Sequence, residues 1–203
     1  MSLQSFSIRW LGLLFISVWL TACSDDAGPG AVDEVLGPVA FESGDECHVC
    51  GMIITELPGA KAQVRESRNA NTHKFCSTQD MLSWWLQPEN KNLQAEIYVH
   101  DVALTPWASP LDEHLIDARS AWYVIGSSLT GAMGPSLVSY SERDAAQALV
   151  DAKGGRVLSW EDLNLDILRE LASAGHEHAT EHGEHLRHQH GVVEPENSHH
   201  DSH

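Results

Sequence analysis

The segment S-T-Q-D-M-L-S-W-W-L at residues 77–86 decides how the fold of this chain is interpreted. Ser77 followed by Asp80 resembles a capping box, which marks the beginning of a helix. The segment S-E-R-D-A-A-Q-A-L-V at residues 141–150 has the same form, with Ser141 at the capping position, and a glycine pair follows it. The two segments therefore predict two equivalent helices.

Short segments that favour strands flank both predicted helices in the same order. Two precede each helix and one follows it: residues 60–67, 73–76 and 96–100 around the first, and residues 121–125, 136–140 and 156–159 around the second. Such a repeated order predicts an internal duplication. We therefore expect an α+β fold in which two tandem ββαβ units, about residues 46–105 and 115–160, form one core domain.

The core domain is expected to span residues 41–172, which at about 130 residues is the size of one ordinary domain. Its last part, residues 161–172, predicts a helix with four apolar residues on one face: Leu163, Ile167, Leu168 and Leu171. We expect this C-terminal helix to pack on the second ββαβ unit.

The first 22 residues have the form of a secretory signal peptide, with an apolar run at residues 10–20 that is too short to span a bilayer. The sequence L-T-A-C ending at Cys23 looks like a bacterial lipobox, which implies cleavage before Cys23 and a lipid anchor on that residue. The alternative is an ordinary signal peptide that is cleaved nearby. Residues 23–40 are rich in glycine, proline and acidic residues, and predict a flexible linker.

The C-terminal segment, residues 173–203, predicts a disordered tail, because it is rich in histidine and glutamate and has few apolar residues to bury. It holds nine of the 13 histidines of the chain: His176, His178, His182, His185, His188, His190, His199, His200 and His203. Imidazoles at this density bind divalent metals such as Cu(II), Zn or Ni. We interpret the tail as an accessory site for additional divalent metal.

The formal net charge of −17 limits the classes of partner that the chain can bind. Nucleic acids and anionic lipids favour basic surfaces, so neither is expected as a ligand. We expect no small-molecule substrate either. The acidic composition is compatible with cations and with a basic protein surface.

The segment E-C-H-V-C-G-M at residues 46–52 concentrates metal ligands in a short stretch. Its thiols and its thioether are soft donors, which together select Cu(I) over hard cations. In an extended segment, His48, Cys50 and Met52 would project to one face. Alternatively, Cys47 and Cys50 would close a C-x-x-C chelate, and the sequence leaves both arrangements open.

Cys76 is the third thiol of the core domain if Cys23 carries lipid. Three thiols cannot all pair as disulfides, so at least one is free or a metal holds several as thiolates. A structural zinc site would need a fourth ligand, for which the core offers only a single histidine, His73 or His100. A redox-active C-x-x-C would open a helix, whereas the residues after Cys50 favour strands and a turn.

Met133 is the second candidate thioether ligand. It lies in G-A-M-G-P at residues 131–135, a loop with no apolar periodicity, so a ligand role and a packing role are equally compatible with its position. If the two ββαβ units pack together, this loop could meet the segment around Cys50. A site built from Cys and Met, with one position open, would hold Cu(I) tightly but exchangeably.

Several motifs together resemble the NosL family, lipoproteins that supply copper during maturation of the periplasmic nitrous oxide reductase. The motifs are C-H-V-C-G-M-I-I with L-P-G-A-K-A-Q-V after it, K-F-C-S-T-Q-D, and A-W-Y-V-I-G-S with G-A-M-G-P. The resemblance covers roughly residues 46–160 and implies a fold similar to a module of organomercurial lyase. It implies Cys50 as the Cu(I) thiolate and Met52 and Met133 as methionine ligands.

Some members of the family keep a single core cysteine within an H-x-C-x-M pattern, which here corresponds to His48, Cys50 and Met52. Cys47 and Cys76 therefore stay open as ligands. The metal ligands that we predict are Cys47, His48, Cys50, Met52 and Met133, with Cys76 as a further candidate.

The resemblance implies a metallochaperone rather than an enzyme, anchored by lipid on the periplasmic side of a bacterial membrane. It would bind one Cu(I) per core domain and pass it to apo nitrous oxide reductase or to the membrane assembly complex of that enzyme. Two alternatives remain from the residues alone. They are a periplasmic thiol oxidoreductase that uses Cys47 and Cys50, and a Zn- or Ni-binding lipoprotein that acts through its histidine-rich tail.

Overall fold

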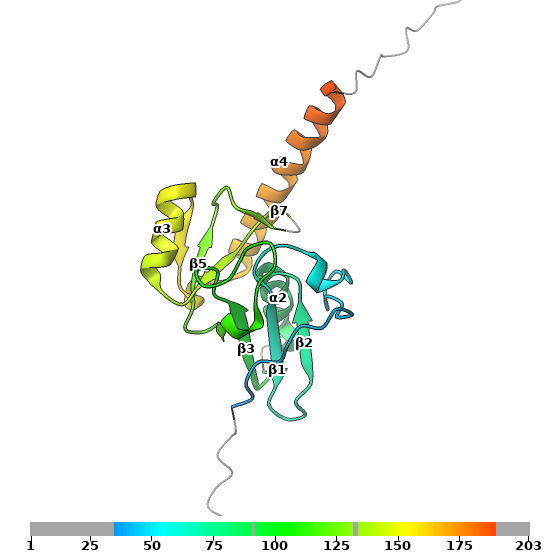
Figure 1. Ribbon diagram of the computed structural model, residues 1–203, viewed down its shortest axis with the longest axis vertical. Helices are drawn as coiled ribbons and strands as arrows, with labels where there is room; N and C mark the ends of the chain where they lie inside the picture. Colours follow the sequence, from blue (N-terminus) through cyan, green and yellow to red (C-terminus); the bar gives the residue numbers. More distant parts are fainter. Residues whose placement is uncertain (1–34, 91, 132–133, 190–203) are drawn as a thin grey trace, which may run out of the picture. The chain divides into compact units, whose positions relative to one another are not determined.

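A computed structural model describes residues 35–90, 92–131 and 134–189 of the chain (Figure 1). Cys23, Met133 and the histidines from His190 onward lie outside these ranges, so the predictions about them rest on the sequence. Along residues 177–179 and 181–189 only the course of the backbone is described. No helix in the described part is long and apolar enough to cross a membrane.

The first sheet has four antiparallel strands in the order β2-β1-β3-β4. The strands are β1 (Ala62–Glu66), β2 (Thr72–Phe75), β3 (Ala95–His100) and β4 (Leu115–Asp117). β4 falls in the range expected for the second unit, yet it pairs with β3, where Ile116 lies opposite Val99. The first sheet therefore extends further along the chain than the expected boundary near residue 105.

The second sheet has three antiparallel strands in the order β8-β5-β9. They are β5 (Trp122–Ile125), β8 (Val138–Tyr140) and β9 (Arg156–Leu158), and a short hairpin of β6 (Thr130–Gly131) and β7 (Gly134–Pro135) is inserted between β5 and β8. The order strand, strand, helix, strand thus occurs twice along the chain, and in both sheets the first of these strands lies in the middle. The mixed α+β fold is confirmed.

The helix α2 (Thr78–Trp85) begins as the sequence predicts, because the hydroxyl oxygen of Ser77 accepts a hydrogen bond from the backbone N–H of Asp80 at 3.0 Å. The helix α3 (Arg143–Lys153) begins differently. Its N-cap is Glu142, which makes no capping bond, and the hydroxyl of Ser141 donates to the buried carboxylate of Asp101 instead. The expected cap is thus present in α2 and absent from α3.

The last helix, α4 (Leu165–Gln189), begins later and ends later than the sequence predicts. Residues 160–162 form a separate 3-10 turn, η4 (Trp160–Asp162), which has its own capping box with Ser159. The helix then continues to residue 189, which contradicts the disorder expected from residue 173 onward. Alanine and glutamate recur along this stretch, and both favour helix.

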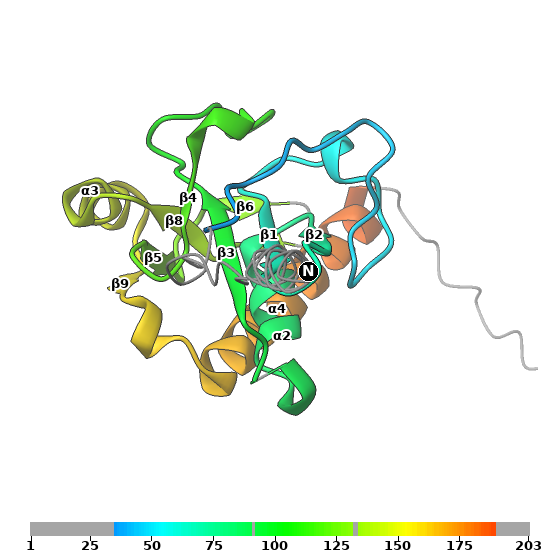
Figure 2. The same ribbon diagram turned by 90° about the horizontal axis from the view of Figure 1, so that it is seen from below.

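The helices α2 and α4 and both sheets contribute to one main core. Side chains of β1, β3, α2 and β5 meet in it, among them Val64, Ile97, Met81 and Tyr123, and Leu163, Ile167 and Leu171 join them from the C-terminal end. The helix α4 contacts both β7 (Figure 1) and α2 (Figure 2), so it packs against both units rather than against the second alone. A smaller cluster of buried side chains lies between α3 and its sheet.

The residues just before the core are bound to the first sheet. The carbonyl of Leu36 accepts from the Tyr98 hydroxyl of β3 at 2.8 Å, and Val39 makes two hydrogen bonds with the Gln63 side chain of β1. The carbonyl of Ala40 accepts from the Lys74 ammonium group of β2 at 2.7 Å. Residues 36–40, which the composition predicts as flexible linker, are therefore an ordered strap across three strands.

Three further 3-10 turns connect these elements. They are η1 (Ile54–Glu56), η2 (Pro88–Asn90) and η3 (Asp112–His114). The first of them directly follows the segment that carries the predicted metal ligands, and its Ile54 is completely buried in the core. Burial of this side chain fixes the C-terminal side of the ligand segment to the body of the domain.

Candidate metal centre

The segment from Cys47 to Met52 forms a tight turn. The backbone N–H of Cys47 donates to the carbonyl of Met52 at 2.8 Å, and the N–H of Gly51 donates back to the carbonyl of Cys47 at 2.9 Å. Gly51 has a φ of 73°, a left-handed conformation that glycine adopts without steric cost. An isolated bridge between Glu46 and Ile53 closes the base of the turn. The extended arrangement that we considered for this segment is therefore wrong.

The turn is docked on the end of β2. The N–H of His48 donates to the carbonyl of Lys74 at 2.8 Å, two residues before Cys76. Cys76 lies between β2 and α2, and Asp80 lies in the first turn of α2, where the cap by Ser77 holds its backbone. The turn and the beginning of α2 therefore bring their side chains to the same place.

Four donor atoms converge at that place, from Cys47, Cys50, Cys76 and Asp80. The three sulfurs and one carboxylate oxygen all lie within 4.8 Å of one another. The Cys76 thiol donates to Asp80 Oδ2 at 3.1 Å, the Cys47 thiol lies 3.3 Å from the same oxygen, and the sulfurs of Cys50 and Cys76 are 3.5 Å apart. Among the described residues, this is the one cluster of three or more Cys, His, Asp or Glu side chains with metal-binding spacing.

The cluster is buried on one side and accessible on the other. Cys47 and Cys76 are almost fully buried, at 3% and 0% relative exposure, whereas Cys50 is partly exposed. All three cysteines are free thiols. A metal bound here would have solvent or a partner on the side of Cys50.

The protonation of the cluster shows how closely its groups interact. The hydrogen bond with Cys76 holds the pKa of the Cys47 thiol well below its usual range, and that same bond is the main cause that raises the pKa of Cys76. Burial raises the pKa of Cys50 and also that of Asp80, the latter to about 6. Groups this close cannot all ionise without a cation, so the binding of a metal would displace the shared protons.

The donor set fits a soft or borderline metal. Thiolates suit Cu(I) and Zn, and hard cations such as Mg²⁺ and Ca²⁺ would require oxygen ligands instead. Three thiolates and a carboxylate could in principle form a four-coordinate zinc site, and two or three of the thiolates could hold Cu(I). The donor chemistry is therefore compatible with the metal that the sequence predicts.

Asp80 is the member of the cluster that the sequence analysis missed as a ligand. The sequence indicated Asp80 only as part of a helix cap. The spacing C-x-x-x-D over residues 76–80, across the beginning of a predicted helix, is the signal that could have identified it, because positions four apart lie on one side of a helical turn.

The other predicted histidine and methionine ligands lie in different surroundings. Met52 is partly buried and packs with Cys50 against the core. The ring of His48 lies outside the cluster and contacts the rings of His73 and Trp84. His100 is buried elsewhere, where its Nδ1 accepts from the backbone N–H of Lys61 at 3.0 Å. His176 is exposed on α4.

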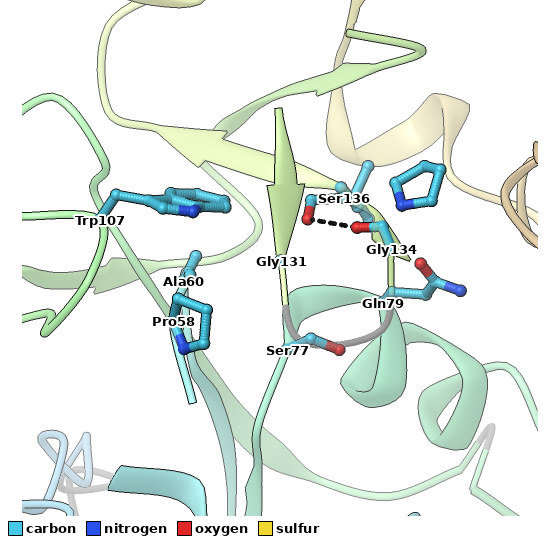
Figure 3. Close-up of a pocket in the computed structure, with 11 residues that line it drawn as sticks. Pro58, Ala60, Ser77, Gln79, Trp107, Gly131, Gly134 and Ser136 are labelled. Atoms are coloured by element: carbon cyan, nitrogen blue, oxygen red, sulfur yellow. Dashed lines mark hydrogen bonds between the residues drawn. The ribbon is translucent and has the colours of Figure 1, made fainter. Parts of the chain in front are cut away.

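The hairpin that carries Met133 approaches the beginning of α2 with its described residues. Gly131 and Gly134 line a small cavity of about 20 Å³ together with Ser77 and Gln79, the neighbours of Cys76 and Asp80 in the sequence (Figure 3). The indole N–H of Trp107 donates to the carbonyl of Thr130 at 3.1 Å and so ties the hairpin to the loop after β3. A Cβ on Gly131 would lie 2.6 Å from the Ser136 hydroxyl, which explains why glycine occurs there.

Comparisons with known proteins find a family model and relatives that are named as copper-binding. Residues 38–168 match the family model described as NosL. The chain is 51% identical over 163 residues to the copper-binding lipoprotein NosL of Stutzerimonas stutzeri, which covers 80% of this chain and 83% of that protein. It is 35% identical over 147 residues to the copper-binding lipoprotein NosL of Achromobacter cycloclastes, covering 71% and 74% of the two chains.

A solved structure supports the fold as well. The crystal structure of the copper chaperone NosL from Shewanella denitrificans superposes with a TM-score of 0.60 at 43% identity and covers 63% of this chain and 96% of that one. These relatives carry names of copper-binding proteins and chaperones, which are not enzymes in kind. From the matching family model and the identity to these relatives, the chain belongs to the NosL family.

Proposed function

We propose that this protein is a lipid-anchored Cu(I) chaperone that supplies copper for the assembly of periplasmic nitrous oxide reductase. The observation that carries the proposal is the convergence of the sulfurs of Cys47, Cys50 and Cys76 within 4.8 Å, with Cys50 on the accessible side. Soft sulfur donors select Cu(I), and an accessible thiolate allows a ligand of the recipient to attack the metal before it is released.

Cys50 is the central ligand in this proposal. Met52 follows it in the same turn, and Met133 would approach from the hairpin whose Gly131 and Gly134 lie near the beginning of α2. Cys47 and Cys76 would hold the metal in the resting state and yield it as the recipient binds. The single cluster in the described part of the chain supports the proposal of one Cu(I) per core domain.

The recipient would be apo nitrous oxide reductase or its membrane assembly complex. Lipid on Cys23 would keep the protein on the periplasmic side of the membrane, and the divalent metal bound by the histidine-rich tail would be an accessory store. Support for this assignment comes from the names of the relatives, which are copper-binding lipoproteins and a copper chaperone. The acidic chain favours a recipient with a basic surface around its metal entry.

Titration with Cu(I) under anaerobic conditions, in competition with a chromogenic chelator, tests the copper site. We expect Cys50→Ser to lower the Cu(I) affinity by a factor of about 100 or more, or about 2.7 kcal/mol. Met52→Leu and Met133→Leu should lower it less, and Met81→Leu should not change it, because Met81 is fully buried in the core. Cu(I) affinity that stays within threefold of the wild type in Cys50→Ser would contradict the proposed role of this thiolate.

Thiol oxidoreductase activity is disfavoured by the position of the C-x-x-C motif. Cys47 and Cys50 lie in a turn that leads into a bridge, rather than at the N-terminus of a helix, where a thiol is activated. In Cys50→Ala, a chaperone should trap no partner as a mixed disulfide. Recovery of such an adduct under conditions that preserve disulfides would instead favour the redox function.

A further inference from the structure

Two histidine rings lie together beside the thiol cluster, on elements that a backbone hydrogen bond joins. His48 follows Cys47 in the turn, and His73 lies in β2. Their ring centres are 4.6 Å apart and the ring planes are inclined by 63°. The bond from the N–H of His48 to the carbonyl of Lys74, at 2.8 Å, keeps the turn against the strand and so maintains this separation.

The ring of His73 is oriented by a carboxylate. Its Nε2 lies 2.7 Å from Oε1 of Glu66, and Asn69 and Asn71 donate to the two oxygens of that carboxylate. Nε2 therefore carries the proton, and the lone pair of the neutral ring is on Nδ1. A carboxylate behind a histidine is the arrangement that commonly fixes the tautomer of a metal ligand and raises its basicity.

Aromatic side chains restrain both rings. Trp84 lies with its ring centre 4.5 Å from that of His73 and 5.7 Å from that of His48, and Phe75 contacts the His48 ring edge-on at 6.0 Å. Within the described residues, neither nitrogen of His48 nor Nδ1 of His73 has a hydrogen-bond partner. The pair is thus held in place by packing while its nitrogen lone pairs stay available.

The separation of the rings fits a shared metal ion. Two imidazoles that bind one metal at about 2.0–2.1 Å and at roughly right angles have ring centres about 4.5–5 Å apart. Neutral imidazoles prefer borderline divalent cations such as Cu(II), Zn(II) and Ni(II), whereas the neighbouring thiols prefer Cu(I). The two groups therefore differ in donor chemistry although they are adjacent in the sequence.

We propose that His48 and His73 form a second metal site, for a borderline divalent cation, separate from the thiol cluster. Glu66 is its positioning residue, and water or an external ligand completes the coordination on the exposed side of His48. The site does not depend on the proposed delivery of Cu(I). It gives the surface next to the thiols a place for divalent metal, so that such a cation need not compete for the thiolates.

Zn(II) is the probe, because it does not react with thiols by electron transfer. The full-length protein is used with the nine histidines from His176 onward replaced by glutamine, both metal-free and after loading with one equivalent of Cu(I). NMR of the histidine rings follows the titration, and calorimetry gives the affinity. We expect the ring signals of His48 and His73 to shift together with one equivalent of Zn(II) in the Cu(I)-loaded protein.

Substitutions then separate a metal site from mere ring packing. His48→Ala and His73→Ala should each lower the Zn(II) affinity of the loaded protein 10- to 100-fold, and Glu66→Gln about tenfold with a change in the His73 tautomer. His114→Ala is the matched control, because His114 lies 3.5 Å from Glu113 and, among the described residues, its ring makes no contact with another imidazole. Two results would overturn the second site. One is Zn(II) binding that leaves the NMR signals of His48 and His73 unchanged. The other is a Zn(II) affinity of His48→Ala and His73→Ala that stays within threefold of that of the protein with only its C-terminal histidines replaced. Failure of the Cu(I) loading step would count against the proposed function alone.

Discussion

The beginnings of α2 and α3 are related in sequence and differ in what they carry. Each helix follows a pair of antiparallel strands, and the residues C-S-T-Q-D before and in α2 correspond to Y-S-E-R-D at α3. At α2, Ser77 caps the helix and Asp80 turns toward the thiols, whereas at α3 Asp144 is exposed and Ser141 bonds to Asp101. The thiol cluster thus depends on the cap and on the turn that docks over it, rather than on the repeated order of strands and helix.

The largest loss of stability is expected for a substitution at Gly155, where two backbone segments of the second unit come close together. A Cβ on Gly155 would lie 2.8 Å from the backbone nitrogen of Ser127 and would also meet the carbonyl of Ile125, at a φ of 95°. Gly155→Ala should therefore cost about 3 kcal/mol or more of stability. Gly154→Ala, where only the φ of 77° is unfavourable, should cost about 1–2 kcal/mol. Urea unfolding of the two variants checks this, and equal midpoints would contradict the close approach after α3.

Acid should lower the free energy of unfolding through His100, which lies where the two units meet. Burial lowers the pKa of His100 from 6.5 to about 4, and its carbonyl accepts from the Ser139 hydroxyl of β8 at 2.7 Å. Between these two values the unfolded chain binds a proton that the folded protein does not, so stability falls as the pH falls from 6.5 to 4, by about 2–3 kcal/mol. Unfolding measured against pH in His100→Gln should lack this component, and His114→Gln should retain it.

The two serines allow a direct test of the different helix beginnings. Ser141→Ala leaves the buried Asp101 carboxylate without one of its donors and should cost about 2 kcal/mol. Ser77→Ala removes a helix cap and should cost about 1 kcal/mol. Thermal or urea unfolding gives both values. The reverse ranking would show that α3 depends less on its serine than the contact with Asp101 implies.

The last prediction concerns Cu(I) affinity and the two aspartates. Asp80→Asn should lower the Cu(I) affinity about tenfold, or about 1.4 kcal/mol, because the carboxylate lies within hydrogen-bond distance of two of the thiols. Asp144→Asn, at the corresponding position of α3, should leave the affinity within twofold, since its side chain is exposed. A similar decrease in both variants would mean that overall charge, rather than the position of Asp80, matters.

Six strands of the two sheets and both central helices could be predicted from the sequence, because alternation and capping residues are local signals. The soft donors of residues 46–52 marked Cys50 as a candidate ligand in the same way, and its role stays a prediction. The site geometry could not be predicted. Whether residues 47–52 were extended or turned depended on the bond from Cys47 to Met52 and on docking against Lys74, which are tertiary contacts. Ser141 failed as a cap for a similar reason, since a buried carboxylate from another strand competed for its hydroxyl.

Composition misled at both ends of the core. The histidine-rich stretch after residue 172 continues as helix to Gln189, because the buried part of α4 provides the nucleus that an isolated segment would lack. Residues 36–40 have the glycine and proline content of a linker, yet three strands supply hydrogen bonds to them. Low hydrophobicity indicates that a segment cannot fold alone. Such a segment can still be ordered where it contacts the rest of its own domain.

The strap formed by residues 36–40 limits how far the metal centre could travel if Cys23 carries the anchor. Because the strap is bound to the first sheet, the distance from Cys23 to Leu36 cannot exceed the length of about a dozen fully extended residues, which is about 40 Å. A recipient would then have to present its metal-accepting surface close to the membrane, within the distance that this length of chain allows. Lengthening the chain before Leu36 would increase that distance without altering the ligands.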